Sequence, residues 1–167
     1  INKAAEKEKI HITVLDEQTL RKNKRGGILA VGAGSRSRPR MLILDYRPGR
    51  RLKVSKTMKT AVLVGKGVTF DSGGINLKTS SGLEDMKMDM AGAASVAGIL
   101  IATARLKVGY RLIGVIPVVE NMISGDASRP GDIIQTYAGK TVEITNTDAE
   151  GRLILADAMA YAVKNYK

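Results

Sequence analysis

Two apolar, β-branched stretches constrain the fold of this chain most strongly. TAVLVGKGVTF occupies residues 60–70, and RLIGVIPVV occupies residues 111–119. A half-exposed strand alternates apolar and polar residues, whereas these runs stay apolar, which is typical of strands covered on both faces. A chain of 167 residues is long enough to bury such strands in a hydrophobic core. We therefore expect a layered sheet with helices on both sides.

The remaining patterns predict helices and strands that alternate along the chain. The chain after DSGG, residues 71–74, reads as a loop until about residue 85, and residues 25–35 form a Gly-rich stretch. The small residues of AGAASVAGILIATARLK predict a helix that packs closely on all sides. Alternation of this kind favours an α/β fold, a three-layer α/β/α arrangement around a mixed, largely parallel sheet. The other expected elements are helices at 1–9 and 16–23, strands at 10–15 and 40–46, and two strands within 131–146 joined at Ala138-Gly139.

The net charge of +11 is confined to the first third of the chain. Residues 1–59 carry 16 Lys and Arg against 5 Asp and Glu, whereas residues 60–167 carry 11 of each. We divide the single domain accordingly into a basic amino-terminal part, 1–59, and a core, 60–167. Nucleic-acid binding through the basic part is one interpretation. Solvated surface is the other, because no aromatic residues interleave with the cations as a single-strand stacking surface requires.

Composition excludes several classes of site. The chain has no Cys, so disulfides, thiolate nucleophiles and zinc-finger chemistry are excluded. Its one histidine, His11, lies in KIHITVLD, where a strand residue is the commoner interpretation. No apolar run reaches the roughly 18 residues of a membrane span, and no signal peptide is recognisable. The expected location is the cytoplasm, with no membrane contact.

Ionisable residues gather where the buried strands end. Lys66 lies within the stretch 60–70 and Asp71 directly follows it, Asp148 comes soon after TVEITN, and Asp89 precedes an apolar helix. The carboxyl ends of strands are where α/β sheets build sites. Together with Glu150, these carboxylates would repel one another unless cations held them together. Two divalent ions bound by oxygen ligands would do so.

NTDAEGRLILADAM, residues 146–159, has two interpretations. Thr147 and Glu150 match a capping box at a helix start. Alternatively, Asp148, Glu150 and Arg152 face a site. Positions two apart in a helix point about 200° from each other, whereas in an extended loop they lie on the same side. The second interpretation therefore predicts an extended loop, with helix beginning near Arg152.

Three segments resemble the active-site segments of the leucyl aminopeptidase family, the dinuclear-metal cytosolic aminopeptidases. They are VGKGVTFDSGGINLK, MKMDMAGAASV and NTDAEGRLILADAM, and the likeness extends over nearly the whole chain from about residue 10. The resemblance implies a metal-dependent enzyme that hydrolyses the N-terminal peptide bond of peptides with a free N-terminus.

The resemblance also implies a set of metal ligands. Asp71 and Glu150 would bridge two divalent ions. Asp148 would complete the first site, and Lys66 and Asp89 the second. Zn²⁺ and Mn²⁺ are the expected ions, with Mg²⁺ or Co²⁺ as alternatives at one site. Lysine ligates only as a neutral amine, and both burial and two nearby dications would depress its pKa.

Catalytic and substrate-binding roles follow from the same resemblance. Lys78 would be the catalytic lysine, a cation that contacts the substrate and polarises its carbonyl. Arg152 would hold a bicarbonate ion, since a guanidinium pairs bidentately with a planar oxyanion. Met86 would line the pocket for the N-terminal side chain, and Asp89 would also contact substrate.

The chain departs from the family pattern in length. Family members carry an N-terminal domain before this region and a long C-terminal remainder after LADAM, and they assemble as hexamers. Both flanking parts are absent from these 167 residues, so the sheet is expected to be incomplete. We expect residues 1–167 alone to be weakly active or inactive.

Overall fold

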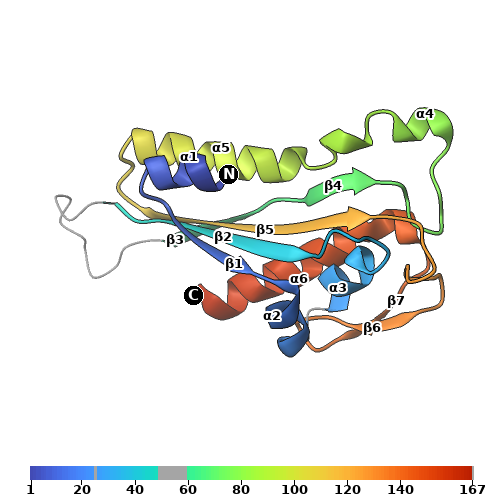
Figure 1. Ribbon diagram of the computed structural model, residues 1–167. Helices are drawn as coiled ribbons and strands as arrows, with labels where there is room; N and C mark the ends of the chain where they lie inside the picture. The colour runs from blue at the N-terminus through green and yellow to red at the C-terminus, as the bar shows by residue number, and fades with distance from the viewer. Residues whose placement is uncertain (25, 49–59, 167) are drawn as a thin grey trace.

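A mixed five-stranded sheet forms the middle layer of the computed structural model, which describes residues 1–24, 26–48 and 60–166 (Figure 1). Helices α1 (Asn2–Lys7) and α5 (Ala91–Arg105) cover one face of the sheet. Helices α2 (Glu17–Lys22), α3 (Gly26–Gly32) and α6 (Glu150–Asn165) lie on the other. The predicted α/β/α layering is confirmed. The strands are β1 (His11–Leu15), β2 (Arg40–Tyr46), β3 (Thr60–Val64), β4 (Gly67–Asp71) and β5 (Arg111–Asn121).

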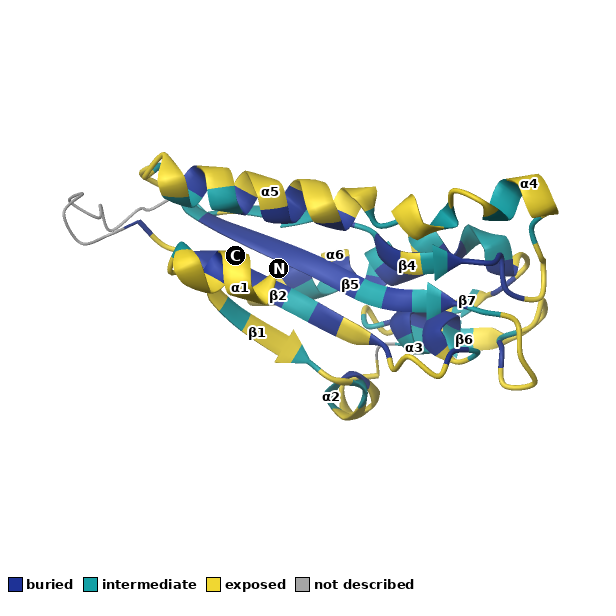
Figure 2. Ribbon diagram, turned by 45° about the horizontal axis from the view of Figure 1, so that its top comes forward, coloured by how far each residue is buried: buried dark blue, intermediate teal, exposed yellow. Residues whose placement is uncertain are grey.

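Strand β5 is the centre of the sheet. It pairs antiparallel with β2, which in turn pairs antiparallel with β1, and it pairs parallel with both β3 and β4. Its side chains alternate between two cores: Ile113 and Val115 pack on the α6 side, Leu112 and Ile116 on the α5 side. Figure 2 shows β5 buried along most of its length. This confirms that residues 111–119 form a strand covered on both faces.

We expected one continuous strand over residues 60–70, but the structure divides this stretch into β3 and β4. The division falls at Gly65 and Lys66. A Cβ on Gly65 would lie 2.5 Å from the carbonyl oxygen of Gly92 in the first turn of α5, so the chain approaches that helix too closely for any side chain. The Lys66 carbonyl accepts a hydrogen bond from the Ala93 N–H at 2.8 Å. The strand is therefore interrupted where it anchors the start of α5.

Helix α5 packs on one side only, which corrects the prediction of close packing all round. Ala93, Val96 and Leu100 are buried against the sheet, whereas Ile99 on the outer side is 47% exposed. On the face of α5 toward the sheet, small side chains allow close packing. On its outer face, the small side chains pack against no other element among the described residues. The stretch Ser80–Arg105 has the length and hydropathy of a membrane span, and 28% of its most apolar window is buried. A single helix that meets these two criteria is weak evidence for a membrane span.

Three further stretches have different outcomes. The Gly-rich stretch contains helix α3. The predicted loop that ends at about residue 85 contains a single helical turn, α4 (Ser80–Leu83), and leads to the 3₁₀ turn η1 (Met86–Met88). The two strands within 131–146 are confirmed as β6 (Ile133–Gln135) and β7 (Thr141–Glu143), which form a separate hairpin sheet around a turn at Gly139 with φ +84°. The proposed division at residue 59 stays a prediction, because residues 49–59 lie outside the described residues.

Candidate metal centre

The candidate site lies where β4 and β5 end. The two strands run parallel, so their carboxyl ends, Asp71 and Asn121, meet at one edge of the sheet. The 3₁₀ turn η2 (Thr147–Ala149) and the first turn of α6 reach the same edge. Figure 1 shows the start of α6 near the ends of β4 and β5. The fold thus brings together segments some 80 residues apart.

Three carboxylates converge at this edge. Asp71, Asp89 and Glu150 each offer an oxygen atom, and the three atoms lie within 4.8 Å of one another. Asp71 and Glu150 are each only 2% exposed. Carboxylates at such separations and burial repel strongly unless cations neutralise them. The cluster is therefore built to receive positive charge.

Lys66 supplies one such charge. Its Nζ lies 2.7 Å from both carboxylate oxygens of Asp89 and 2.7 Å from Oε1 of Glu150. Burial lowers the pKa of Lys66, but the hydrogen bonds and charges of these two carboxylates outweigh burial and raise the pKa above its ordinary value. Against protein groups alone, Lys66 is an ammonium. Its amine lies between Asp89 and Glu150, two carboxylates that the family resemblance assigns to one metal site.

Lys78 supplies the second charge. Its Nζ lies 3.2 Å from Oδ2 of Asp71 and forms an ion pair with Oδ1 of Asp148. Burial again lowers the pKa, but the hydrogen bonds and charges of Asp148 and Asp71 raise it overall. Asp148, whose side chain is 32% exposed, is outside the three-carboxylate group but joined to it through Lys78. Of the eight residues predicted for the site, the structure brings six into one network: Lys66, Asp71, Lys78, Asp89, Asp148 and Glu150.

The network carries more negative than positive charge. Asp71, Asp89, Asp148 and Glu150 face only two lysines. Two buried oxygens, Oδ1 of Asp148 and Oε2 of Glu150, have no hydrogen-bond partner among the described residues, although the first is ion-paired with Lys78. Burial raises the pKa of Glu150, as does the charge of Asp71, while the hydrogen bond from Lys66 opposes them. A group of oxygen ligands with excess negative charge, and with buried oxygens that lack a hydrogen-bond partner, fits divalent cations.

The two interpretations of residues 146–159 are resolved by hydrogen bonds. The Thr147 hydroxyl donates to the carbonyl of Gly73 at 2.7 Å, and no side-chain cap is present at the start of α6, so the capping box is not formed. The prediction of an extended loop with helix from Arg152 is also wrong, because η2 runs directly into α6 at Glu150. Asp148 and Glu150 need not point the same way, since each contacts a different lysine.

Sequence reasoning missed Asn121 and Asn76, which link the end of β4 and the loop after it to the turn η2. The Asn121 carboxamide donates to Oδ1 of Asp71 at 2.8 Å and to the carbonyl of Thr147 at 3.0 Å. Asn76 adds a reciprocal pair, its N–H donating to the Thr147 hydroxyl at 2.9 Å and its Oδ1 accepting from the Thr147 N–H at 2.8 Å. Asn121 follows directly on a buried strand, which is the signal that could have found it.

Two predicted residues lie at the margin. Arg152, in the first turn of α6, is exposed. Met86 begins η1 and is half-buried. The arginine is thus on the helix that carries Glu150, two residues from that carboxylate, and the methionine is three residues from Asp89.

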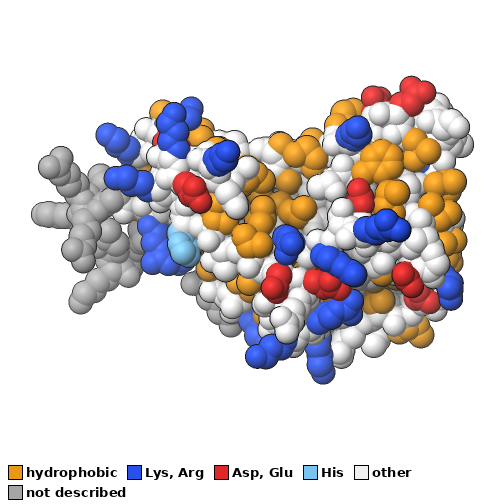
Figure 3. Space-filling view, viewed as in Figure 1, with side chains coloured by type: hydrophobic (Ala, Val, Ile, Leu, Met, Phe, Trp, Pro, Cys, Tyr) orange, Lys and Arg blue, Asp and Glu red, His pale blue; other side chains and the backbone are white. Residues whose placement is uncertain are grey.

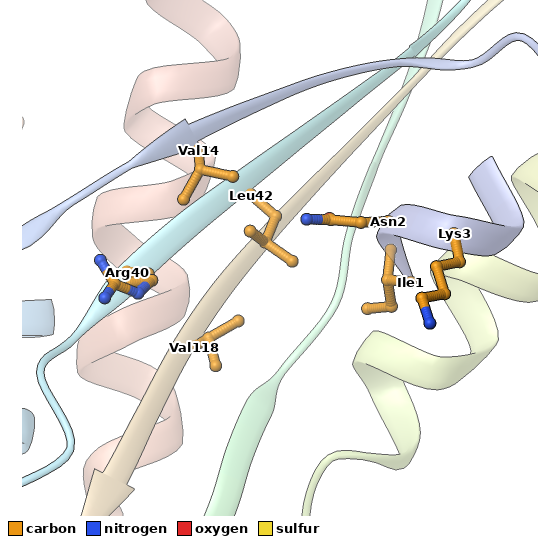
Figure 4. A pocket seen from close by; sticks show the side chains of 7 residues that line it. All are labelled: Ile1, Asn2, Lys3, Val14, Arg40, Leu42 and Val118. Atoms are coloured by element: carbon orange, nitrogen blue, oxygen red, sulfur yellow. The ribbon is translucent and has the colours of Figure 1, made fainter. Parts of the chain in front are cut away.

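The surface cavity shown in Figure 4 is a different place. It measures about 630 Å³ and is lined by Val14, Leu42 and Val118 of the sheet and by the first residues of the chain. Its polar groups come from Asn2, Lys3 and Arg40. Because the described residues that line this cavity include no carboxylate, we place the chemistry at the charged network.

Comparison with known proteins matches this arrangement to one family. The model of the cytosol aminopeptidase family, catalytic domain, matches residues 1–167. The chain belongs to the cytosol aminopeptidase family. The family resemblance expected from the three sequence segments is therefore confirmed.

Individual relatives agree with that assignment. A protein of Chlorobium limicola named "Probable cytosol aminopeptidase" is 59% identical over 141 residues, covering 84% of this chain and 27% of the relative. A protein of the same name from Corynebacterium glutamicum is 51% identical over 158 residues, covering 95% of this chain and 30% of the relative. This member of the family thus spans about three-tenths of the length of these relatives.

A solved structure resembles the whole chain. The bottromycin maturation enzyme BotP, in complex with Mn, superimposes with a TM-score of 0.89 at 40% sequence identity. The match covers 99% of this chain and 35% of BotP. The likeness confirms the α/β fold of this cytosol aminopeptidase family member.

Proposed function

We propose that this chain forms the dinuclear metal site of an aminopeptidase, which hydrolyses the N-terminal peptide bond of peptides. One observation carries the proposal: carboxylate oxygens from three separate segments, Asp71, Asp89 and Glu150, lie within 4.8 Å of one another in a member of the cytosol aminopeptidase family. The Mn bound by BotP, which is similar in fold, supports a divalent metal here.

The network supports the metal ligands implied by the family resemblance. Asp71 is paired with Lys78 and Glu150 with Lys66, and these two carboxylates would both be shared by two divalent ions. Asp148 would complete the first site, and Lys66 with Asp89 the second. Two such cations would supply Lewis-acid activation of the attacking water and of the scissile carbonyl. Zn²⁺ or Mn²⁺ at both sites, or Mg²⁺ or Co²⁺ at one, remain our predicted ions.

Lys78 would act on the substrate. Its ammonium is now held by Asp71 and Asp148, and cations that neutralise these carboxylates would weaken that hold. A side chain 19% exposed can then turn toward a carbonyl oxygen at the same edge. A cation near that oxygen stabilises the negative charge that develops on it during attack.

Three further residues would complete the site. Arg152 would bind bicarbonate through two parallel N–H donors, and such an anion would supply the base that the lone His11 does not. Met86 would contact the N-terminal side chain of the peptide, and Asp89 its amino terminus. A hexameric assembly and a cytoplasmic location also remain predictions.

The nucleic-acid alternative has less support. On the face seen in Figure 3, Lys and Arg side chains are interspersed with Asp and Glu. Several cations of the first third are paired: Arg21 and Arg38 with Glu17, and Arg47 with Asp45. The basic run 49–59 lies outside the described residues. A salt-dependent DNA mobility-shift assay would detect such binding.

The first test is metal binding and hydrolysis. At its natural full length, the protein should bind two Mn²⁺ per chain by elemental analysis after dialysis, because the network lacks positive charge. It should release leucine from a leucine amide substrate, and chelation should abolish that activity. Stray metal only after dialysis against excess Mn²⁺ would reject the dinuclear site, and two bound ions without hydrolysis would reject the activity.

A second test concerns residues 1–167 taken alone. We expect them to hydrolyse a leucine amide far more slowly than the Chlorobium limicola relative, of which they match 27%. Positioning a substrate supplies roughly 7–11 kcal/mol of a barrier, and the described site is an edge with Asp148 partly open to solvent. The measurement is kcat/KM of both proteins with Mn²⁺. Comparable values would contradict the expectation.

A further inference from the structure

Gly151, the second residue of α6, is a glycine that the backbone does not require. Among the described residues, the glycines with positive φ are Gly73, Gly74, Gly131 and Gly139, so Gly151 has a conformation that alanine adopts readily. Glycine in a helix is less favourable than alanine by about 1 kcal/mol. Some other feature must account for a glycine at this place.

The space beside Gly151 is filled by one side chain. A Cβ on Gly151 would lie 3.0 Å from Cε of Lys66, 3.2 Å from its Cδ and 3.4 Å from its Nζ. These are the last atoms of the lysine, just before the amine that contacts Asp89 and Glu150 at 2.7 Å. The end of the Lys66 side chain therefore packs against the first turn of α6.

The kind of atom in contact decides what a side chain at Gly151 would disturb. At Gly65 and Gly92, a Cβ would meet backbone, 2.5 Å from the Gly92 carbonyl oxygen and 2.9 Å from the Lys66 nitrogen. Substitution there would disturb the fold. At Gly151, the atoms met belong to the flexible end of Lys66, which can move without disturbing the backbone. The displacement would fall on the amine.

We propose that Gly151 is a positioning residue for Lys66: the absence of its side chain allows the lysine amine to reach the position between Asp89 and Glu150. The proposal rests on the proposed function, in which that amine is a metal ligand. A methyl group at residue 151 would push the amine away from the second metal site. The helix itself would gain from the same change.

Stability and metal affinity should therefore change in opposite directions. In the protein at its natural full length, Gly151→Ala should leave Tm unchanged or raised, while the Kd for one of the two Mn²⁺ ions rises about 10–100-fold, the range seen when groups that orient ligands are altered. Isothermal titration with Mn²⁺ and thermal unfolding without metal measure the two quantities. Neither readout depends on catalysis.

Gly98→Ala is the matched control. Gly98 lies within α5 and a Cβ there would meet nothing within 4 Å. It should leave Tm unchanged or raised through helix propensity and leave both Mn²⁺ affinities unchanged. A loss of affinity in this control as well would overturn the proposal, because the effect would not be specific to Lys66.

A double-mutant cycle tests whether Gly151 acts through Lys66. In a Lys66→Ala background, adding Gly151→Ala should cause no further loss of Mn²⁺ affinity, since the side chain that it displaces is gone. An additional loss of equal size, or an unchanged affinity in Gly151→Ala alone, would overturn the proposal. If the unsubstituted protein binds no Mn²⁺, the proposed function fails instead, so the two failures are distinguishable.

Discussion

Asp71→Ala should abolish the binding of both metal ions and lower kcat/KM by about 10³-fold or more, because Lewis-acid activation contributes several kcal/mol to catalysis. Asp71 is 2% exposed, and its Oδ1 accepts from the Gly73 N–H at 2.9 Å and from Asn121 at 2.8 Å. These two donors fix the carboxylate, so its other oxygen, Oδ2, is left to face cations. Elemental analysis and peptidase kinetics measure the two effects.

The control for Asp71→Ala is Asp45→Ala. Asp45 is also a buried carboxylate paired with cations, accepting hydrogen bonds from Arg111 and Arg47, but it lies at the far end of β2 from the site. Asp71→Ala leaves the buried donors of Gly73 and Asn121 without an acceptor, which costs about 1–3 kcal/mol of unfolding free energy. The Arg111 and Arg47 side chains that lose their partner in Asp45→Ala are 22% and 67% exposed, so that substitution should cost less. Only Asp71→Ala should lose metal. Two ions retained by Asp71→Ala would contradict its bridging role.

The strands of the sheet could be predicted because a strand that is buried on both faces consists almost entirely of apolar residues. Residues 111–119 stay apolar since β5 is packed on both faces, and the charged residues that end or follow such strands mark the site. Asp71 was found in this way. Asn121 obeys the same rule, yet an amide without charge gives a weaker signal than a carboxylate.

The break between β3 and β4 could not be predicted, because it depends on contacts distant in sequence. Gly65 approaches the carbonyl of Gly92, and only the packed structure shows which glycines meet. The start of α6 was misjudged for a related reason. Asp148 and Glu150 were expected to converge on a single point, whereas Lys78 and Lys66 give each its own partner.

Lys78→Ala should retain both metal ions yet lower kcat about 10²–10³-fold, the usual cost of removing one electrostatic stabiliser. Lys78 contacts Asp71 and Asp148, and its removal leaves both carboxylates without their ammonium partner. Cations then compete with no lysine for these oxygens, so the affinity for Mn²⁺ should be unchanged or tighter. Steady-state kinetics and isothermal titration on the same preparation separate the two effects.

Lys87→Ala provides the comparison, since Lys87 is an exposed lysine of η1 that no described contact joins to the network. It should leave kcat and Mn²⁺ affinity unchanged. A metal ligand and a catalytic cation differ in what their loss removes: the first empties a site, and the second leaves full sites that turn over slowly. If Lys78→Ala emptied the sites while Asp71→Ala did not, the roles of the two residues would have to be exchanged.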